Sequence, residues 1–270
     1  MLADVQHSYA SYGHHVPKWQ TTFHGGVQSI NYGTFQAADV FGNVNGTFRA
    51  SEYAITLGAG KQLYERLSIG LNAKLISSQL ESYNALGIST DIGATFQDTS
   101  RNFIIALVLK NWGTSLKSYT QDLNEPLNRE MQLGFSKRLK YLPFRFGATY
   151  RYLNRWNILY DDPNTQENTF LQGALEETDD NNPFLNNLFR HFTFNGEFLL
   201  GKAENLRLRM GYDALRSQEL KVNDLRSLAG FSFGVGVKVN RFRIDYGQGV
   251  YHLAGSSNHF SISTNLSEFR

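Results

Sequence analysis

The sequence predicts an all-β protein, a transmembrane antiparallel up-and-down β-barrel. Three observations support this fold class. Apolar and polar residues alternate with a period of two over many segments, the connections between those segments alternate between short and long, and the charged residues fall on the face opposite the apolar one. A period of two is the pattern of a strand with one apolar and one polar face. A helical period cannot produce it.

The strands can be placed from this alternation in chain order. They are expected at 5–14, 19–32, 47–61, 66–78, 84–97, 102–112, 129–138, 143–153, 190–200, 205–213, 228–239, 242–249 and 258–267. The pattern is clearest at 228–239, where Phe and Val face one side and glycine, serine and lysine face the other. It is weakest at Phe103–Leu109, which is apolar on both faces and also fits a buried strand.

The connections are sorted by length. Tight links are expected at 16–18, 62–65, 98–101, 139–142, 201–204 and 240–241. Most of the others are long, at 33–46, 113–128, 154–189, 214–227 and 250–257, with the link 79–83 as a short exception. Short turns at one end and long loops at the other are typical of outer-membrane barrels. A soluble sandwich has no reason to sort its connections in this way.

The strand count has a further implication. The segments above give thirteen strands, whereas single-chain bacterial barrels have even numbers, with both termini on the periplasmic side. The first expected strand runs into a short turn, so it begins on the outer side. We therefore expect an N-terminal strand, and the signal peptide, to be missing from this chain, and the complete barrel to have about fourteen strands. The chain, 1–270, is expected to form a single outer-membrane barrel domain.

The polar faces of the strands carry charges of both signs. An Arg or Lys on the lipid face at the bilayer midplane costs about 2–4 kcal/mol. Turning all of them outward would exceed a typical domain stability of roughly 5–15 kcal/mol. We therefore expect these residues to line the lumen of the barrel: Lys74, Asp91, Arg145, Arg151, Glu197, Arg207, Arg209, Asp213, Lys238, Arg243 and Asp245.

Composition and motifs exclude several function classes. The net charge of +2 and the pI of about 8.7 are too mild to indicate nucleic-acid binding. The chain has no cysteine, so it has neither a thiol nucleophile nor a Cys-based zinc site. The run Gly58-Ala59-Gly60-Lys61 lacks the spacing of a phosphate-binding loop. We find no catalytic motif and expect no catalytic, cofactor-binding or metal-binding residues.

The long connection 154–189 is the best candidate for a functional segment, because loops on a rigid scaffold commonly carry binding. Its apolar residues are candidate anchors for a partner, above all Phe170, Leu171, Phe184 and Leu185. Two interpretations remain open at this point. The segment forms either a plug that closes the pore or a docking surface for another protein.

Several stretches resemble a known family. They include "FHGGVQSINYGTFQAADVFGN" (23–43), "MQLGFSKRLKYLPFRFGATYRYLNRWNI" (131–158), "LAGFSFGVGVKV" (228–239) and "YHLAGSSNHFSISTNLSEF" (251–269). They are similar to the PorQ family, outer-membrane β-barrels of the type IX secretion system of Bacteroidota, which resemble PorV and, more distantly, FadL-type barrels. The resemblance implies a fourteen-stranded FadL-like barrel in the outer membrane of a Gram-negative cell.

The resemblance also implies a function. Members of this family are surface anchors, not enzymes, and the implied partner is a PorZ-like surface protein of the cargo attachment complex, beside PorU-type and PorV-type components. Outer-membrane lipids would surround the barrel, and no cofactor is implied. Two other functions are weighed against this one. FadL-like transport of hydrophobic small molecules would need an apolar path through the barrel, and an outer-membrane hydrolase would need a Ser/His/Asp cluster at one rim.

Overall fold

The computed structural model describes residues 5–120, 127–158, 183–201, 203–219, 228–252 and 255–269. The chain divides into two compact units. The first comprises Met1–Gly147 and Ala254–Ser256, and the second comprises Ala148–Leu253 and Ser257–Arg270. Each unit is described on its own below. The expectation of a single domain over 1–270 stays a prediction.

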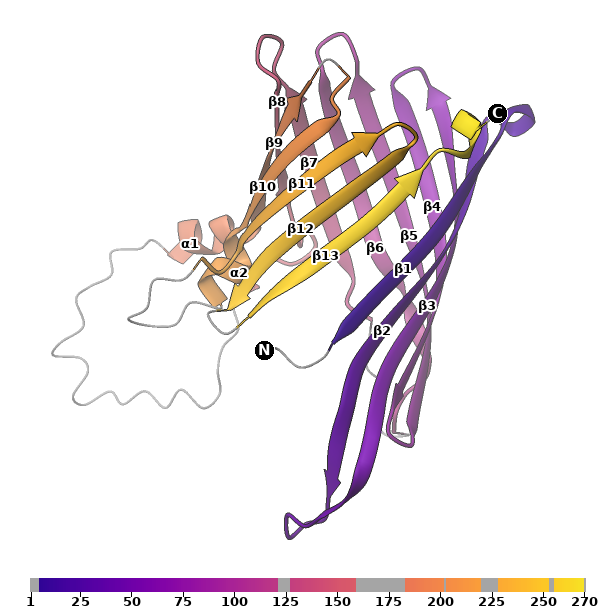
Figure 1. Cartoon of the computed structure of the whole chain (residues 1–270), viewed down its shortest axis with the longest axis vertical. Helices are drawn as coiled ribbons and strands as arrows, with labels where there is room; N and C mark the ends of the chain where they lie inside the picture. The colour runs from indigo at the N-terminus through magenta and orange to yellow at the C-terminus, as the bar shows by residue number, and fades with distance from the viewer. Residues whose placement is uncertain are drawn as a thin grey trace, which may run out of the picture. The chain divides into compact units, whose positions relative to one another are not determined.

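The first unit is a meander of antiparallel strands (Figure 1). Its strands are β1 (Gln6–Val16), β2 (Thr21–Ala38), β3 (Val44–Tyr64), β4 (Leu67–Leu80), β5 (Tyr83–Asp98), β6 (Phe103–Lys117) and β7 (Glu130–Arg138), followed by the start of β8 (Phe144–Tyr150). Each strand pairs with its neighbours in the chain. A short 3-10 helix, η1 (Pro17–Trp19), makes the turn between β1 and β2.

The second unit continues the same up-and-down order with two short helices (Figure 1). After the end of β8 it contains α1 (Pro183–Arg190), β9 (Phe192–Leu200), β10 (Leu206–Asp213), α2 (Ala214–Glu219), β11 (Phe231–Val239), β12 (Phe242–His252), β13 (Gly255–Thr264) and the 3-10 helix η3 (Leu266–Phe269). β10 pairs with β9 and β11, and β11 pairs with β12, all antiparallel. The strand order over the described residues follows the chain from β1 to β13.

All thirteen expected strands are confirmed, but some of their ends differ. β2 and β3 extend through residues expected to be a loop, because their pairing continues beyond a bulge to Phe35 and Phe48, whose rings stack at 5.3 Å. The expected strand 228–239 begins at Phe231 instead. Gly230 precedes it in a left-handed conformation with φ of 88°, which the strand conformation does not allow. The helix α2 lies within a segment expected to be a loop.

The apolar side chains are the accessible ones in both units. In β4, Leu71 is 52% exposed, whereas the side chain of Lys74 is only 17% exposed. In β10, Met210 is 52% exposed, and the side chain of Arg207 is 22% exposed. Water-soluble proteins show the opposite distribution. The chain is therefore an all-β, antiparallel up-and-down protein of the outer-membrane β-barrel class, in which strands present apolar side chains to lipid.

Among the described helices, none combines the length and the hydropathy that crossing a membrane requires.

Candidate functional site

The charged residues predicted for the lumen all lie in the described part of the chain, on strands or next to strand ends. Where they lie on a strand, they alternate with the exposed apolar side chains. Lys74 and Asp91 lie on β4 and β5, Arg145 lies on β8 with Arg151 directly after it, Glu197 lies on β9, Arg207, Arg209 and Asp213 lie on β10, Lys238 lies on β11, and Arg243 and Asp245 lie on β12. Their position in a lumen stays a prediction, but most of them are joined in ion pairs.

Arg209 is the centre of the largest charge cluster among the described residues of the second unit. Its Nε donates to Glu197 Oε1 at 2.9 Å, and its Nη1 donates to Asp245 Oδ1 at 2.6 Å. Glu197 lies directly opposite Arg209 on the adjacent strand β9. Asp245 lies two strands away in the other direction, on β12. One guanidinium therefore connects β9, β10 and β12, and its planar set of donors suits two carboxylates at once.

The link from Arg209 to Asp245 passes over β11, and Gly236 makes it possible. Gly236 is paired with Arg207 on one side and with Asp245 on the other. A Cβ at Gly236 would collide with Asp245 Oδ1 and would lie 3.3 Å from its Cγ and 3.4 Å from Arg209 Nη1. Residue 236 is therefore a glycine for reasons of space, because any side chain would displace the ion pair.

Further ion pairs extend this charged face. Arg207 lies 4.0 Å from Glu197, which it shares with Arg209. Arg151 Nη1 lies 3.4 Å from Asp213 Oδ2. Two carboxylates that sequence reasoning missed also take part: Glu204 lies 3.9 Å from Arg207, and Glu268 lies 3.4 Å from Lys238. The three-residue spacing of Glu204 and Arg207 is the one signal that could have indicated the first of these. Arg243 forms no ion pair with any described residue and is paired with Lys238, a like charge.

A second, smaller polar cluster lies in the first unit. Lys74 Nζ lies 2.7 Å from Asp91 Oδ1 and donates to Asn111 Oδ1 at 2.7 Å. Asp91 also accepts from the backbone N–H of Asn111 at 2.9 Å. The register of β5 and β6 shifts here between Thr90 and Ile92, and Asn111 has φ of 57°. Asn tolerates this conformation better than most residues, so the bulge and the ion pair support each other.

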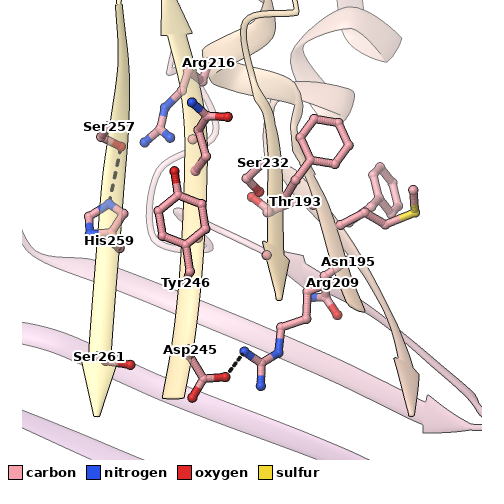
Figure 2. Close-up of a pocket in the computed structure, with 18 residues that line it drawn as sticks. Thr193, Asn195, Arg209, Arg216, Ser232, Asp245, Tyr246, Ser257, His259 and Ser261 are labelled. Carbon is pink, nitrogen blue, oxygen red and sulfur yellow. Dashed lines mark hydrogen bonds and ion pairs between the residues drawn. The ribbon is translucent and has the colours of Figure 1, made fainter. Parts of the chain in front are cut away.

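A cavity of about 500 Å³ opens on the charged face of the second unit (Figure 2). Four of the residues that line it are glycines, Gly211, Gly234, Gly247 and Gly249, and they are called its floor below. Polar residues line the cavity as well: Thr193, Asn195, Ser232, Ser257, His259 and Ser261. Arg209, with its partner Asp245, lies at one end, and Arg216 of α2 lies at the other (Figure 2). The strands β9 to β13 all contribute.

The start of β9 is held by a buried histidine. His191 is fully buried, with ring nitrogens 2.6 Å and 3.0 Å from the backbone carbonyl oxygens of Arg151 and Trp156. Its ring stacks on Tyr150 at 4.7 Å and on Trp156 at 5.6 Å. Asn187 of α1 donates to the same Trp156 carbonyl at 2.8 Å. The helix α1 is thereby tied to the segment that follows β8.

The helix α1 packs with its polar side inward and its apolar side outward. Asn187 is 5% exposed, whereas Phe184, Leu185 and Phe189 are 57%, 50% and 55% exposed. These three residues form the apolar stripe of α1. Phe184 and Leu185 were predicted as candidate partner anchors. Phe189 was not predicted and is identified from the structure alone. The other two predicted anchors, Phe170 and Leu171, lie outside the described residues, as does most of the connection 154–189.

The described residues offer no arrangement for metal chemistry. No group of three or more His, Asp or Glu side chains within the described ranges could hold a metal ion. The carboxylates that lie close together form ion pairs with Arg and Lys side chains, and such pairs connect neighbouring strands. The arrangement supports binding and mechanical stiffness.

No family model matches the chain, and no curated protein matches it. Among solved structures, the chain is similar to a triple-mutant porin of Rhodopseudomonas blastica, with 9% identity and a TM-score of 0.32, over 96% of this chain and 88% of the porin chain.

Proposed function

We propose that this protein is an outer-membrane barrel that acts as a surface anchor and holds a partner protein through α1 and the connection 154–189 that contains it. The observation that carries the proposal is the apolar stripe of α1. A helix in a soluble domain buries its apolar side and exposes its polar side. In α1 the polar Asn187 is buried and the apolar stripe is exposed, so the helix is oriented to receive an apolar surface from outside.

The attachment of α1 supports the same function. Asn187 and His191 fix the helix and the start of β9 to the backbone of Trp156. Phe184 also packs against the Trp156 ring at 5.0 Å. A binding element that is held in place before binding loses less conformational entropy when the partner docks. The stripe is therefore presented on a fixed support.

The ion pairs of the strands are consistent with an anchor. Ties across three strands stiffen the wall, and carboxylates and guanidinium groups on one face oppose a continuous apolar path. FadL-like transport of hydrophobic molecules would need such a path. The outer membrane is the location that the exposed apolar faces of the strands favour. The sequence resemblance suggests the finer identity: a PorQ-like member of a type IX secretion system, with a PorZ-like partner and PorU-type or PorV-type components nearby.

The test is recovery of the partner with the anchor. The tagged protein, in its full-length natural form, would be purified from detergent-solubilised outer membranes, and the proteins that accompany it would be identified by mass spectrometry. The variant carries Phe184→Ser, Leu185→Ser and Phe189→Ser together. We expect the unaltered protein to retain a large PorZ-like surface protein and the variant to lose it, while both barrels keep the same heat-modifiable migration on gels.

The control places the same change elsewhere on the protein. Leu63, Tyr141 and Leu142 are exposed apolar residues at two of the expected short turns. Their combined replacement by serine should leave partner recovery unchanged. Normal recovery by the α1 variant would contradict the proposal. Recovery of the unaltered barrel with fatty acids or lipids alone would favour transport in its place.

A further inference from the structure

The cavity floored by the glycines of β10, β11 and β12 has no part in the proposed anchoring. We propose that it is a binding site for a small neutral carbohydrate. Its volume of about 500 Å³ lies within the roughly 300–1,000 Å³ that small-molecule sites occupy. Three features carry the assignment: glycines in the floor, polar side chains that mostly make no hydrogen bond to the described residues, and an Arg209 that is already paired with two carboxylates.

Of Gly211, Gly234 and Gly247, only Gly247 lacks a close neighbour that would require a glycine. A Cβ at Gly211 would lie 2.6 Å from Ser232 Oγ, and one at Gly234 would lie 3.3 Å from the Tyr246 carbonyl oxygen. Gly211, Gly234 and Gly247 all have φ outside the left-handed region, so their backbone conformation accommodates other residues. A Cβ at Gly247 would find its nearest neighbour, the Phe233 carbonyl oxygen, at 3.7 Å, which is ordinary contact. A strand interior normally favours β-branched and aromatic residues, and glycine weakens it. The glycine at 247 therefore has one clear effect, which is to leave the space above it empty.

Most of the polar side chains around the floor make no hydrogen bond within the described part of the chain. The side chains of Thr193, Asn195, Ser232 and Ser261 make no hydrogen bond to any described residue, and Ser257 Oγ contacts only His259 Nε2, at 3.3 Å. Hydroxyl and amide groups both donate and accept hydrogen bonds. Each hydroxyl group of a ligand can likewise donate and accept a hydrogen bond. A ligand rich in hydroxyl groups can therefore form hydrogen bonds with all of these side chains together.

The charges at the ends of the cavity favour a neutral ligand. Arg209 already donates to Glu197 and Asp245, so it presents little uncompensated field to the cavity. Arg216 lies at the other end and has interactions of its own. An anion would need a free guanidinium, whereas a neutral sugar needs hydrogen-bond partners on several sides. The residues that surround the floor supply these from β9, β11 and β13 (Figure 2).

The experiment measures binding of maltose to the full chain by saturation-transfer NMR and calorimetry. The detergent is lauryldimethylamine oxide, because a maltoside would compete for the site. The test variant is Gly247→Val, whose side chain would occupy the cavity without a backbone clash. We expect it to raise the dissociation constant for maltose by at least about tenfold. Asn195→Ala removes a polar group without adding bulk and should also weaken binding.

The matched control is Gly93→Val, on the polar face of β5 in the first unit. A Cβ there has its nearest neighbour at 3.8 Å, so the change is sterically equivalent. It should leave maltose binding unchanged, and all variants should keep the heat-modifiable migration of a folded barrel. Absence of maltose, sucrose and methyl-glucoside binding at millimolar concentration would overturn the proposal. Binding of inorganic phosphate in preference to these sugars, or an equal loss in Gly93→Val, would overturn it as well.

Discussion

Removing the Arg209 guanidinium should destabilise the second unit, and the structure sets the size of the effect. In Arg209→Met, Asp245 loses its ion pair with Arg209, and Glu197 keeps its ion pair with Arg207, at 4.0 Å. Breaking a buried ion pair costs about 3–5 kcal/mol, and exposed pairs contribute only about 0.2–1 kcal/mol. The side chains of Glu197 and Asp245 are 13% and 21% exposed, whereas Arg209 is 36% exposed. We therefore expect a loss of about 1–3 kcal/mol, between these limits.

The assay is urea unfolding of the barrel in phospholipid vesicles, followed by tryptophan fluorescence. Arg243→Met is the control, because Arg243 lies on the same strand as Asp245 and forms no ion pair with the described residues. It should change the free energy of unfolding by less than about 0.5 kcal/mol. Gly236→Val should match Arg209→Met, since its side chain would separate Arg209 from Asp245 without removing a charge.

A double-mutant cycle isolates the Arg209–Asp245 pair. If the two residues stabilise each other, Arg209→Met combined with Asp245→Asn should lose less stability than the sum of the two single changes, by about 0.5–3 kcal/mol. Additive losses would refute the interaction. So would an Arg209→Met variant as stable as the unaltered protein, or an Arg243→Met variant that loses as much.

Two further predictions concern His191 and Asp39. His191→Phe keeps an aromatic ring in the stack but removes the ring nitrogens that contact the carbonyl oxygens of Arg151 and Trp156, of which the Trp156 oxygen keeps Asn187 as a donor. We therefore expect a loss of about 1–3 kcal/mol, measured as faster hydrogen exchange in α1. His7→Phe, at an exposed position of β1, should show no such change. At the β2–β3 turn, hydrogen bonds from the Asn43 side chain and backbone hold the pKa of Asp39 below its ordinary value. The order of this turn should therefore be complete above the ordinary value of about 3.9 and be lost as pH falls through the lower folded pKa; a carboxyl ¹³C titration with its midpoint at or above the ordinary value would contradict this.

The number and the two faces of the strands could be predicted from sequence because both are local properties. Alternation with a period of two appears in consecutive residues and does not depend on distant parts of the chain. It placed all thirteen strands and put charges such as Arg209 and Asp245 opposite the apolar side chains. Strand ends were less predictable. β2 and β3 continue beyond their alternating cores because each pairs with the other, and that pairing is a long-range contact.

The helix α1 shows where sequence patterns mislead. Phe184 and Leu185 were singled out from a long connection, and the structure places both on the exposed side of α1, but an apolar stripe on a helix ordinarily predicts the buried side. Only the contacts of Asn187 and His191 with Trp156 reveal that the polar side is the one held down. These contacts join residues about thirty positions apart, and no local pattern encodes them.

The sequence by itself determined which residues are charged and which residues alternate. These two properties indicated the fold class, because an outer-membrane barrel places charged and apolar side chains on opposite faces of its strands. Only the tertiary structure decided their partners. Arg209 meets Asp245 across an intervening strand because the register places Gly236 between them. The cavity is open where Gly234 of β11 lies opposite Gly247 of β12. Register between strands sets these neighbours, and one residue of slip would move every side chain to the other face. A pattern within one strand does not indicate which residue two strands away will lie within hydrogen-bonding distance.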